Sequence, residues 1–346
     1  MGFEELLRGW DGEFAAVRHD AGSGTWMFVC VHASVDGAAG GGTRMRVYPR
    51  PADGLADAMR LSAAMTRKFA AIGLARGGGK AVLAVPALPE GVARRRLMLS
   101  YGDLVASLGG AFRAAGDMNV GPADLDVVEE RCPWVYGSSA RGGDSAPGTA
   151  RGVLHGIRAS VEHAFGSPSL AGRSVLVQGC GAVGARLARS LADEGAAVLV
   201  SDVDEERARA TGFEVVPAGD ALAAECDVYA PCAVGGTLDD DSIRRLDCRV
   251  VAGCANNQLA EPDDARRLHE RGILYAPDYV INAGGVIALT GTVDEGWDDD
   301  ELERNLAGIG ETLRRIYAVA ASEGIPPAEA ADRLVEERLA SRRRAA

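Results

Sequence analysis

Only two of the 37 basic residues in this 346-residue chain are lysines, Lys68 and Lys80, which leaves 35 arginines. An arginine guanidinium stays protonated, whereas a lysine amine loses its proton when it is buried or placed beside another cation. The two lysines lie twelve positions apart, and Lys80 ends the glycine triplet of "LARGGGK". Codon bias is the alternative explanation, but this placement indicates a need for an amine that can exchange a proton.

A carboxylate completes a set of groups suited to amino acid oxidation. Asp117 follows a glycine in "RAAGDMNVG", where an aspartate can also simply cap a turn. One fixed cation would bind a substrate carboxylate, one amine would exchange protons, and one acid would serve the amino group. The fixed cation would also lower the pKa of the amine beside it, because like charges disfavour the charged form. We therefore expect Lys68, Lys80 and Asp117 to share one cleft.

The composition argues against several other kinds of protein. A net charge of -12 disfavours a nucleic-acid-binding protein, which needs a basic face. No apolar run approaches the roughly 20 residues that span a bilayer, and "MGFEELLRGW" lacks the pattern of a secretory signal. The seven cysteines are mostly in apolar surroundings, and no Cys/His cluster has metal-ligand spacing. We expect a cytoplasmic protein with reduced thiols, no metal site and no membrane partner.

The stretch from residue 174 to residue 202 predicts a dinucleotide-binding unit. Residues 174–179 and 197–202 have strand patterns, and residues 182–195 carry apolar side chains at helical spacing. The turn after the first strand fits G-x-G-x-x-G, whose glycines let the backbone approach a pyrophosphate at the helix N-terminus. Its residues are Gly179, Cys180, Gly181, Ala182, Val183 and Gly184.

The end of the second strand predicts which dinucleotide binds. Asp202 lies about 20 residues after the turn, where a carboxylate accepts hydrogen bonds from the adenosine ribose. Val203 and Asp204 follow, and two carboxylates would repel the phosphorylated ribose of NADP, although Arg207 would soften that repulsion. We predict NAD as the cofactor, with Asp202 and Val203 in its site.

The expected fold is α/β with two domains. Short strand patterns at 226–232, 248–254 and 272–277, with helical stretches between them, extend the dinucleotide unit into a doubly wound parallel sheet. We assign residues 1–142 to an α/β substrate-binding and oligomerisation domain and residues 143–319 to a Rossmann-type NAD-binding domain. A return of the C-terminal helix, about residues 320–346, to the first domain is left open, and the final "SRRRAA" is expected to be a solvated tail.

Six motifs, in a fixed order, resemble those of a known family. They are "GGTRM" (41–45), "MTRKFAAIGLARGGGK" (65–80), "GDMNVGPADLD" (116–126), "VLVQGCGAVG" (175–184), "CANNQLA" (254–260) and "APDYVINAGGVI" (276–287). Through them the chain resembles the Glu/Leu/Phe/Val dehydrogenase family, most closely its actinobacterial phenylalanine and valine dehydrogenases. The resemblance implies a homo-oligomer that uses NAD in the reversible oxidative deamination of an L-amino acid to a 2-oxo acid and ammonia. A catalytically idle NAD-binding sensor is the alternative from another class.

The resemblance also implies roles for individual residues. Lys68 would hold the substrate carboxylate, Lys80 would activate the hydrolytic water, and Asp117 would pass protons to and from the amino group. Gly41 and Gly42 are expected to bring backbone close to the substrate, and Thr149 and Asn282 are expected to orient the nicotinamide ring. Asn256 and Asn257 are expected beside this ring, Asn256 on the cofactor side and Asn257 on the substrate side.

The implied side-chain pocket indicates an apolar substrate. Glutamate-specific relatives carry a lysine immediately before the Gly-Gly pair, where this chain has Gly40. Leucine-specific relatives tend to have leucine there, so glycine is expected to open room for a ring. The other pocket positions are Met65, Ala115, Val286 and Leu289. We predict an aromatic, phenylalanine-like substrate, with valine or leucine as the runner-up and tryptophan as a further alternative.

Overall fold

The computed structural model describes residues 2–345, which form two compact units. Unit 1 comprises residues 2–144 and 289–296, and unit 2 comprises residues 145–288 and 297–345. The C-terminal helices therefore cluster with unit 2, a point that the sequence left open. Residues 341–345, expected to be a tail, continue the last helix, α13 (Pro327–Ala345).

Unit 1 is built on a mixed sheet of five strands, in the order β1-β2-β4-β3-β5. Its elements are α1 (Phe3–Arg8), β1 (Phe14–Asp20), β2 (Thr25–Val31), β3 (Ala39–Arg46), α2 (Pro51–Ala71), β4 (Gly77–Ala84), α3 (Gly91–Ser107), β5 (Phe112–Gly116), α4 (Pro122–Glu129) and the π-helix η1 (Gly291–Glu295). Strand β2 is antiparallel to β1 and β4, whereas β3 is parallel to both β4 and β5.

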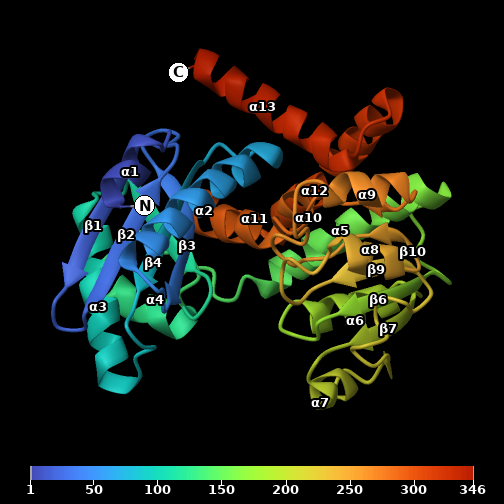
Figure 1. Cartoon of the computed structure of the whole chain (residues 1–346), viewed down its shortest axis with the longest axis horizontal. Coiled ribbons are helices and arrows are strands. Elements are labelled where there is room, and N and C mark those ends of the chain that lie inside the picture. Colours follow the sequence, from blue (N-terminus) through green and yellow to red (C-terminus); the bar gives the residue numbers. More distant parts are fainter. Residues whose placement is uncertain (1, 346) are drawn as a thin grey trace. The chain divides into compact units, whose positions relative to one another are not determined.

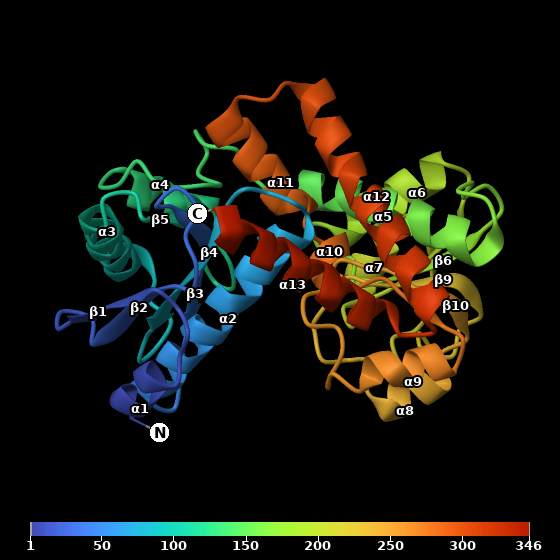
Figure 2. The ribbon, with the colours of Figure 1, turned by 90° about the horizontal axis from the view of Figure 1, so that it is seen from above.

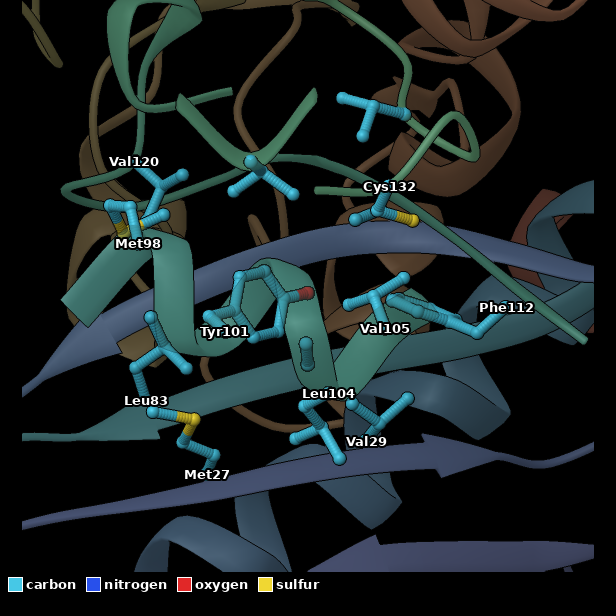
Figure 3. Packing of buried hydrophobic residues seen from close by; sticks show 14 of the residues in the cluster. Met27, Val29, Leu83, Met98, Tyr101, Leu104, Val105, Phe112, Val120 and Cys132 are labelled. Atoms are coloured by element: carbon cyan, nitrogen blue, oxygen red, sulfur yellow. The ribbon is translucent and has the colours of Figure 1, made fainter. Parts of the chain in front are cut away.

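The two faces of this sheet are covered by different helices, as Figures 1 and 2 show for α2 and α3. Met27 of β2 and Leu83 of β4 belong to the core cluster that includes Tyr101 of α3 (Figure 3). Phe28 and Val82 are adjacent to Met27 and Leu83 in these strands, so their side chains lie on the opposite face of the sheet, where they pack with α2. Because side chains alternate along a strand, the even-numbered residues of β3 and β4 lie on the α2 face.

Unit 2 is built on a parallel sheet of six strands, in the order β11-β10-β9-β6-β7-β8. Its elements are α5 (Ala146–Phe165), β6 (Ser174–Gln178), α6 (Gly184–Asp193), β7 (Ala197–Ser201), α7 (Glu205–Arg209), β8 (Glu214–Val215), β9 (Cys226–Pro231), α8 (Asp240–Arg245), β10 (Cys248–Val251), α9 (Asp264–Glu270), β11 (Leu274–Tyr275), α10 (Asp278–Ile281), α12 (Asp299–Glu323) and α13, while α11 (Gly284–Thr290) crosses from unit 2 into unit 1.

This strand order is that of a doubly wound sheet, and it confirms the predicted fold class. The chain winds from β6 outward to β8, then returns to the other side of β6 and winds outward from β9 to β11. The point where the direction reverses, between β6 and β9, is where such sheets bind ligands at the carboxyl ends of the strands. Within residues 2–345 we find no helix that is both long and apolar enough to span a membrane.

Candidate active site

Lys80 and Asp117 form a buried ion pair on the α2 face of unit 1. The Lys80 Nζ lies 2.8 Å from Oδ2 of Asp117, and the side chains are 8% and 23% exposed. Lys80 is within β4, Asp117 follows the last residue of β5, and Gly42 of β3 lies between these strands. A carbon added at Gly42 would lie 2.9 Å from Cβ of Asp117 and 3.0 Å from the Lys80 amine. The glycine therefore lets the ion pair sit directly against the backbone of β3.

The surroundings of this pair lower the pKa of both the amine and the carboxylate. Burial lowers the pKa of the Lys80 amine below the ordinary value of 10.5, against the opposing effect of Asp117. Arg44 of β3 lowers the pKa further by charge repulsion. For Asp117, burial acts to raise the pKa, but the ion pairs with Lys80 and Arg44 outweigh it and hold the pKa below 3.8. The neighbouring cation that the sequence analysis sought in Lys68 is here supplied by Arg44, to which we had given no role.

Lys68 and Met65 lie in the last two turns of α2, which covers the same face of the sheet. The helix approaches β4 very closely, because a carbon added at Gly78 would lie 2.1 Å from the backbone nitrogen of Thr66. Lys68 is half-buried and lies two residues beyond this contact. Sequence spacing thus placed Lys68 and Lys80 on neighbouring elements that pack against each other.

Two aromatic rings occupy the space next to Gly40. A carbon added at Gly40 would lie 3.5 Å from Cε2 of Tyr136 and 3.8 Å from Cζ of Phe69, both ordinary contact distances. The room for a ring that we expected from the missing side chain is therefore bounded by these two rings in this direction. At Gly41 an added carbon would lie 1.8 Å from the carbonyl oxygen of Gly79, so only glycine fits. Ala115 of β5 is the register partner of Gly42.

The Tyr136 ring is held by a charged cluster that the sequence analysis missed. Its hydroxyl donates to Asp294 of η1, and the same carboxylate forms ion pairs with Arg76 and Arg113. The Asp294 side chain is 7% exposed. Arg113 is the register partner of Gly40 and also lies 5.7 Å from the centre of the Tyr136 ring. No local pattern signals this cluster, because its partners are far apart in the sequence.

In unit 2 the predicted glycine turn connects β6 to α6. Gly179 has a φ of +102°, and a carbon added at Gly184 would lie 1.9 Å from the carbonyl oxygen of Gly179. Helix α6 therefore packs against the turn at a distance that only glycine permits. Nothing lies within 4 Å of a carbon added at Gly181, and the neighbouring Ala182 is exposed. The turn leaves an open stretch of backbone at the start of α6, through Val183, for a pyrophosphate to approach.

Asp202 is held in place by backbone donors. Its Oδ2 accepts the N–H of Cys180 at 2.8 Å, and its Oδ1 accepts the N–H of Asp204 at 2.9 Å. Burial acts to raise its pKa, but these bonds and Arg207 hold the pKa below 3.8. Arg207 lies 3.6 Å from Asp202 and 3.1 Å from Asp204, so one cation faces two carboxylates. Val203, between them, is 90% exposed.

The predicted asparagines meet beyond β10. Buried Asn282, which follows α10, donates from Nδ2 to Oδ1 of Asn256 at 2.9 Å and to the carbonyl of Cys254 at 3.3 Å. Asn257, which follows Asn256 in the chain, has a φ of +51°, in the left-handed region that asparagine tolerates better than most residues. The structure thus brings Asn256 and Asn282 together at the carboxyl end of the parallel sheet.

Thr149 lies in the first turn of α5, which approaches the start of α11. A carbon added at Gly284 would lie 2.2 Å from the carbonyl oxygen of Gly148, and one at Gly285 would lie 2.5 Å from Oγ1 of Thr149. The "NAGG" segment after α10 therefore places Thr149 close to the residues that follow Asn282. These glycines allow the first turns of α5 and α11 to pack against each other in unit 2.

The remaining pocket residues are divided between the units. Val286 belongs to unit 2 and Leu289 to unit 1, although both lie in α11. The Leu289 side chain packs on the loop after α4, because a carbon added at Gly142 would lie 2.7 Å from its Cδ2. Among residues 2–345, no group of three or more His, Cys, Asp or Glu is arranged to hold a metal ion.

Comparison with known proteins covers almost the entire chain. Residues 15–134 match the family described as Glu/Leu/Phe/Val dehydrogenase, dimerisation domain, and residues 200–345 match Glutamate/Leucine/Phenylalanine/Valine dehydrogenase. The valine dehydrogenase of Streptomyces virginiae is 43% identical over 94% of this chain and 92% of its own length. The leucine dehydrogenase of Geobacillus stearothermophilus is 39% identical over 99% of this chain and 94% of its own length.

A solved structure shares the fold of the whole chain. It is the L-tryptophan dehydrogenase from Nostoc punctiforme, which is 35% identical and has a TM-score of 0.84 over 99% of both chains. The glutamate dehydrogenase from Peptoniphilus asaccharolyticus shares only the fold, at 21% identity and a TM-score of 0.73.

Proposed function

This chain belongs to the Glu/Leu/Phe/Val dehydrogenase family, whose members oxidise the CH–NH2 group of amino acids, and we propose that its substrate is a branched-chain L-amino acid and its cofactor NAD. The products of deamination would be the 2-oxo acid and ammonia, and the reaction would be reversible. The observation that carries the proposal is the buried Lys80–Asp117 pair held against Gly42.

Each charged residue of unit 1 has a separate task in this reaction. Lys68 binds the substrate carboxylate and so orients the α-carbon. Asp117 accepts a proton from the substrate amino group, which leaves that nitrogen able to form an iminium as the α-carbon is oxidised. Lys80, whose pKa burial lowers, takes a proton in its neutral form from the water that attacks the iminium carbon. Collapse of the resulting carbinolamine releases ammonia and the 2-oxo acid.

The residues of unit 2 fit a bound dinucleotide. NAD, when bound, supplies the acceptor for the hydride that leaves the α-carbon. The open backbone at Gly181 would receive the pyrophosphate, and the fixed carboxylate of Asp202 would accept hydrogen bonds from the adenosine ribose. We assign Thr149 and Asn282 to the nicotinamide end, with Asn256 orienting the Asn282 amide. Asp202 and Asp204, which both pair with Arg207, favour NAD over NADP.

The choice of a branched-chain substrate over an aromatic one rests on the space beside Gly40. Tyr136 and Phe69 lie at contact distance from a carbon added at this position, so they limit the room that glycine leaves for a substrate ring. The similarity to valine and leucine dehydrogenases supports the same choice. Phenylalanine and tryptophan are the alternatives, the latter because of the structural likeness to an L-tryptophan dehydrogenase.

We also propose that the protein assembles as a homo-oligomer through unit 1. The support is the match of residues 15–134 to the part of the family described as its dimerisation domain. Size-exclusion chromatography with light scattering would measure the mass in solution, and a monomer would contradict the proposal.

The test of the function is NADH formation with purified protein, NAD and separate L-amino acids. Valine, leucine and isoleucine should each be turned over, with kcat/KM at least about tenfold above that for phenylalanine or tryptophan, equal to about 1.4 kcal/mol. A preference for phenylalanine or tryptophan would restore the aromatic alternative. Glutamate serves as the negative control, because position 40 offers no lysine to its side-chain carboxylate.

A further inference from the structure

Arg44 contacts the Lys80–Asp117 pair from β3 but has no task in the reaction described above. Its Nε donates to Oδ2 of Asp117 at 2.9 Å, and the Lys80 amine lies 2.8 Å from the same oxygen. Arg44 lies two residues after Gly42 in the same strand, so both point to the α2 face of the sheet. The pair is therefore a group of three, in which two cations share one carboxylate oxygen.

A second carboxylate holds the other end of the Arg44 side chain. Its Nη1 donates to Oδ2 of Asp57 at 3.0 Å, and the hydroxyl of Tyr48 donates to the same oxygen at 2.7 Å. Arg60 lies 2.7 Å from the other oxygen of Asp57. The side chains of Arg44 and Asp57 are only 15% and 13% exposed. Arg44 thus cannot turn away from Asp117 without breaking a buried contact at each end.

Several ionisable groups surround the Lys80 amine. They are Asp117 after β5, Arg44 on β3, Asp57 on α2 and Cys30, the register partner of Lys80 on β2, while α2 also carries Lys68. Burial raises the pKa of Cys30 to about 12, so this thiol is neutral at ordinary pH. With Lys80 protonated, Asp117 is in contact with two cations, Lys80 and Arg44. With Lys80 neutral, Arg44 is the cation that remains in contact with Asp117.

This arrangement solves a problem that any lysine base paired with a carboxylate faces. When such a lysine gives up its proton, the buried carboxylate loses its counter-ion, and an unpaired buried charge is strongly unfavourable. The carboxylate would therefore keep the lysine protonated. Arg44 stays protonated under all ordinary conditions, so Asp117 keeps a cation 2.9 Å away in either state of Lys80.

We propose that Arg44 is a positioning residue for the reaction, because it supplies the permanent charge and the fixed contact that keep Asp117 ionised and oriented while Lys80 releases and takes up a proton. The proposal rests on the proposed function, since it takes Lys80 as the base. Arg44 itself touches neither the substrate nor the attacking water in this scheme. It acts through Asp117 and Lys80.

The first test measures the titration of Lys80 directly, without substrate. Because the chain has only two lysines, protein labelled with [ε-13C]lysine gives two side-chain NMR signals, and Lys68→Arg identifies which signal is Lys80. In Arg44→Gln we expect the pKa of Lys80 to rise by about one unit, because a repelling cation is lost. Arg44→Lys should restore most of the difference. An unchanged Lys80 titration in a folded Arg44→Gln protein would overturn the proposal.

The matched control is Arg60→Gln, which removes another arginine in contact with Asp57. Arg60 is 59% exposed and lies on the far side of that carboxylate from Arg44. The Lys80 titration should stay as in the unchanged protein. If Arg44→Gln does not fold, Arg44→Met also removes the repelling charge while keeping a long side chain, and we expect a rise in the same direction. No rise in that variant would also count against the proposal.

The second test follows turnover against pH. Deamination requires neutral Lys80, so kcat rises with pH through the pKa of this amine, and in Arg44→Gln the rise should move to higher pH by the same one unit or so. At neutral pH the variant should lose about tenfold in kcat, with recovery at alkaline pH. An equal loss at every pH would indicate a merely structural role. If the unchanged protein turns over no amino acid, the proposed function fails, while the NMR titration still decides whether Arg44 controls Lys80.

Discussion

The two halves of the proposed machinery, one in each unit, are constructed on different principles. The dinucleotide site proposed for unit 2 is local: the turn at 179–184 and Asp202 belong to one strand-helix-strand segment. The proton-transfer group proposed for unit 1 is dispersed: Arg44, Asp57, Lys80 and Asp117 come from two strands, a helix and the end of a third strand. The comparison teaches that a phosphate site can be specified by glycines in sequence, whereas a proton relay needs charged side chains brought together by sheet register.

Removing the base should separate the two halves most completely. We expect Lys80→Ala to lower kcat for deamination by about 10³-fold, because general base catalysis is lost, while NAD binding in unit 2 is unaffected. Steady-state NADH formation and calorimetric titration with NAD measure the two effects. Full deamination activity in this variant would refute the assignment of Lys80, and loss of NAD binding would contradict the independence of the halves.

Crowding the ion pair should have the next largest effect. In Gly42→Ala the added methyl would lie 2.9 Å from the backbone oxygen of Gly116 as well as from Cβ of Asp117, so the pair must shift. A displacement of about 1 Å at reacting groups lowers kcat by about 10²-fold. Gly40→Ala is the matched control in the same strand, because its methyl meets neighbours only at 3.5 Å and beyond. Equal rates for both variants would show that the contact at Gly42 is unimportant.

A second glycine pair tests the local half. We expect Gly184→Ala to lower the free energy of unfolding by about 1–3 kcal/mol, because its methyl would lie 1.9 Å from the carbonyl oxygen of Gly179. Gly181→Ala faces open space and should leave thermal stability unchanged while weakening NAD binding. Thermal unfolding with and without NAD distinguishes the two. Unchanged NAD affinity in Gly181→Ala would contradict the placement of the pyrophosphate.

The smallest expected effect concerns the choice of dinucleotide. Asp202→Ser removes one of the two carboxylates that face Arg207, so less negative charge opposes a ribose phosphate beside this arginine. The ratio of kcat/KM for NADP to that for NAD should rise on the order of tenfold, about 1.4 kcal/mol. Val203→Ala, at an exposed neighbouring position, should leave the ratio unchanged. No gain for NADP would mean that Asp202 does not face the ribose.

Much of the fold was readable from sequence because it depends on local patterns. The helix expected at residues 182–195 contains α6 (Gly184–Asp193), and the strand expected at 197–202 is β7 (Ala197–Ser201). Periodicity and turn glycines determine such elements within a few residues. The continuation of α13 through residue 345 was missed, because a run of arginines looks the same on a solvated helix as in a tail.

The sequence by itself determined the family, the glycine turn with Asp202, and the presence of two lysines and an aspartate suited to proton exchange. Only the tertiary structure showed that Arg44 pairs with Asp117 beside Lys80, and that Tyr136 and Phe69 line the space beside Gly40. The physical reason is that glycine geometry is a property of neighbouring residues in the chain. Burial, pKa and pocket volume instead depend on side chains that strand register brings together from distant positions.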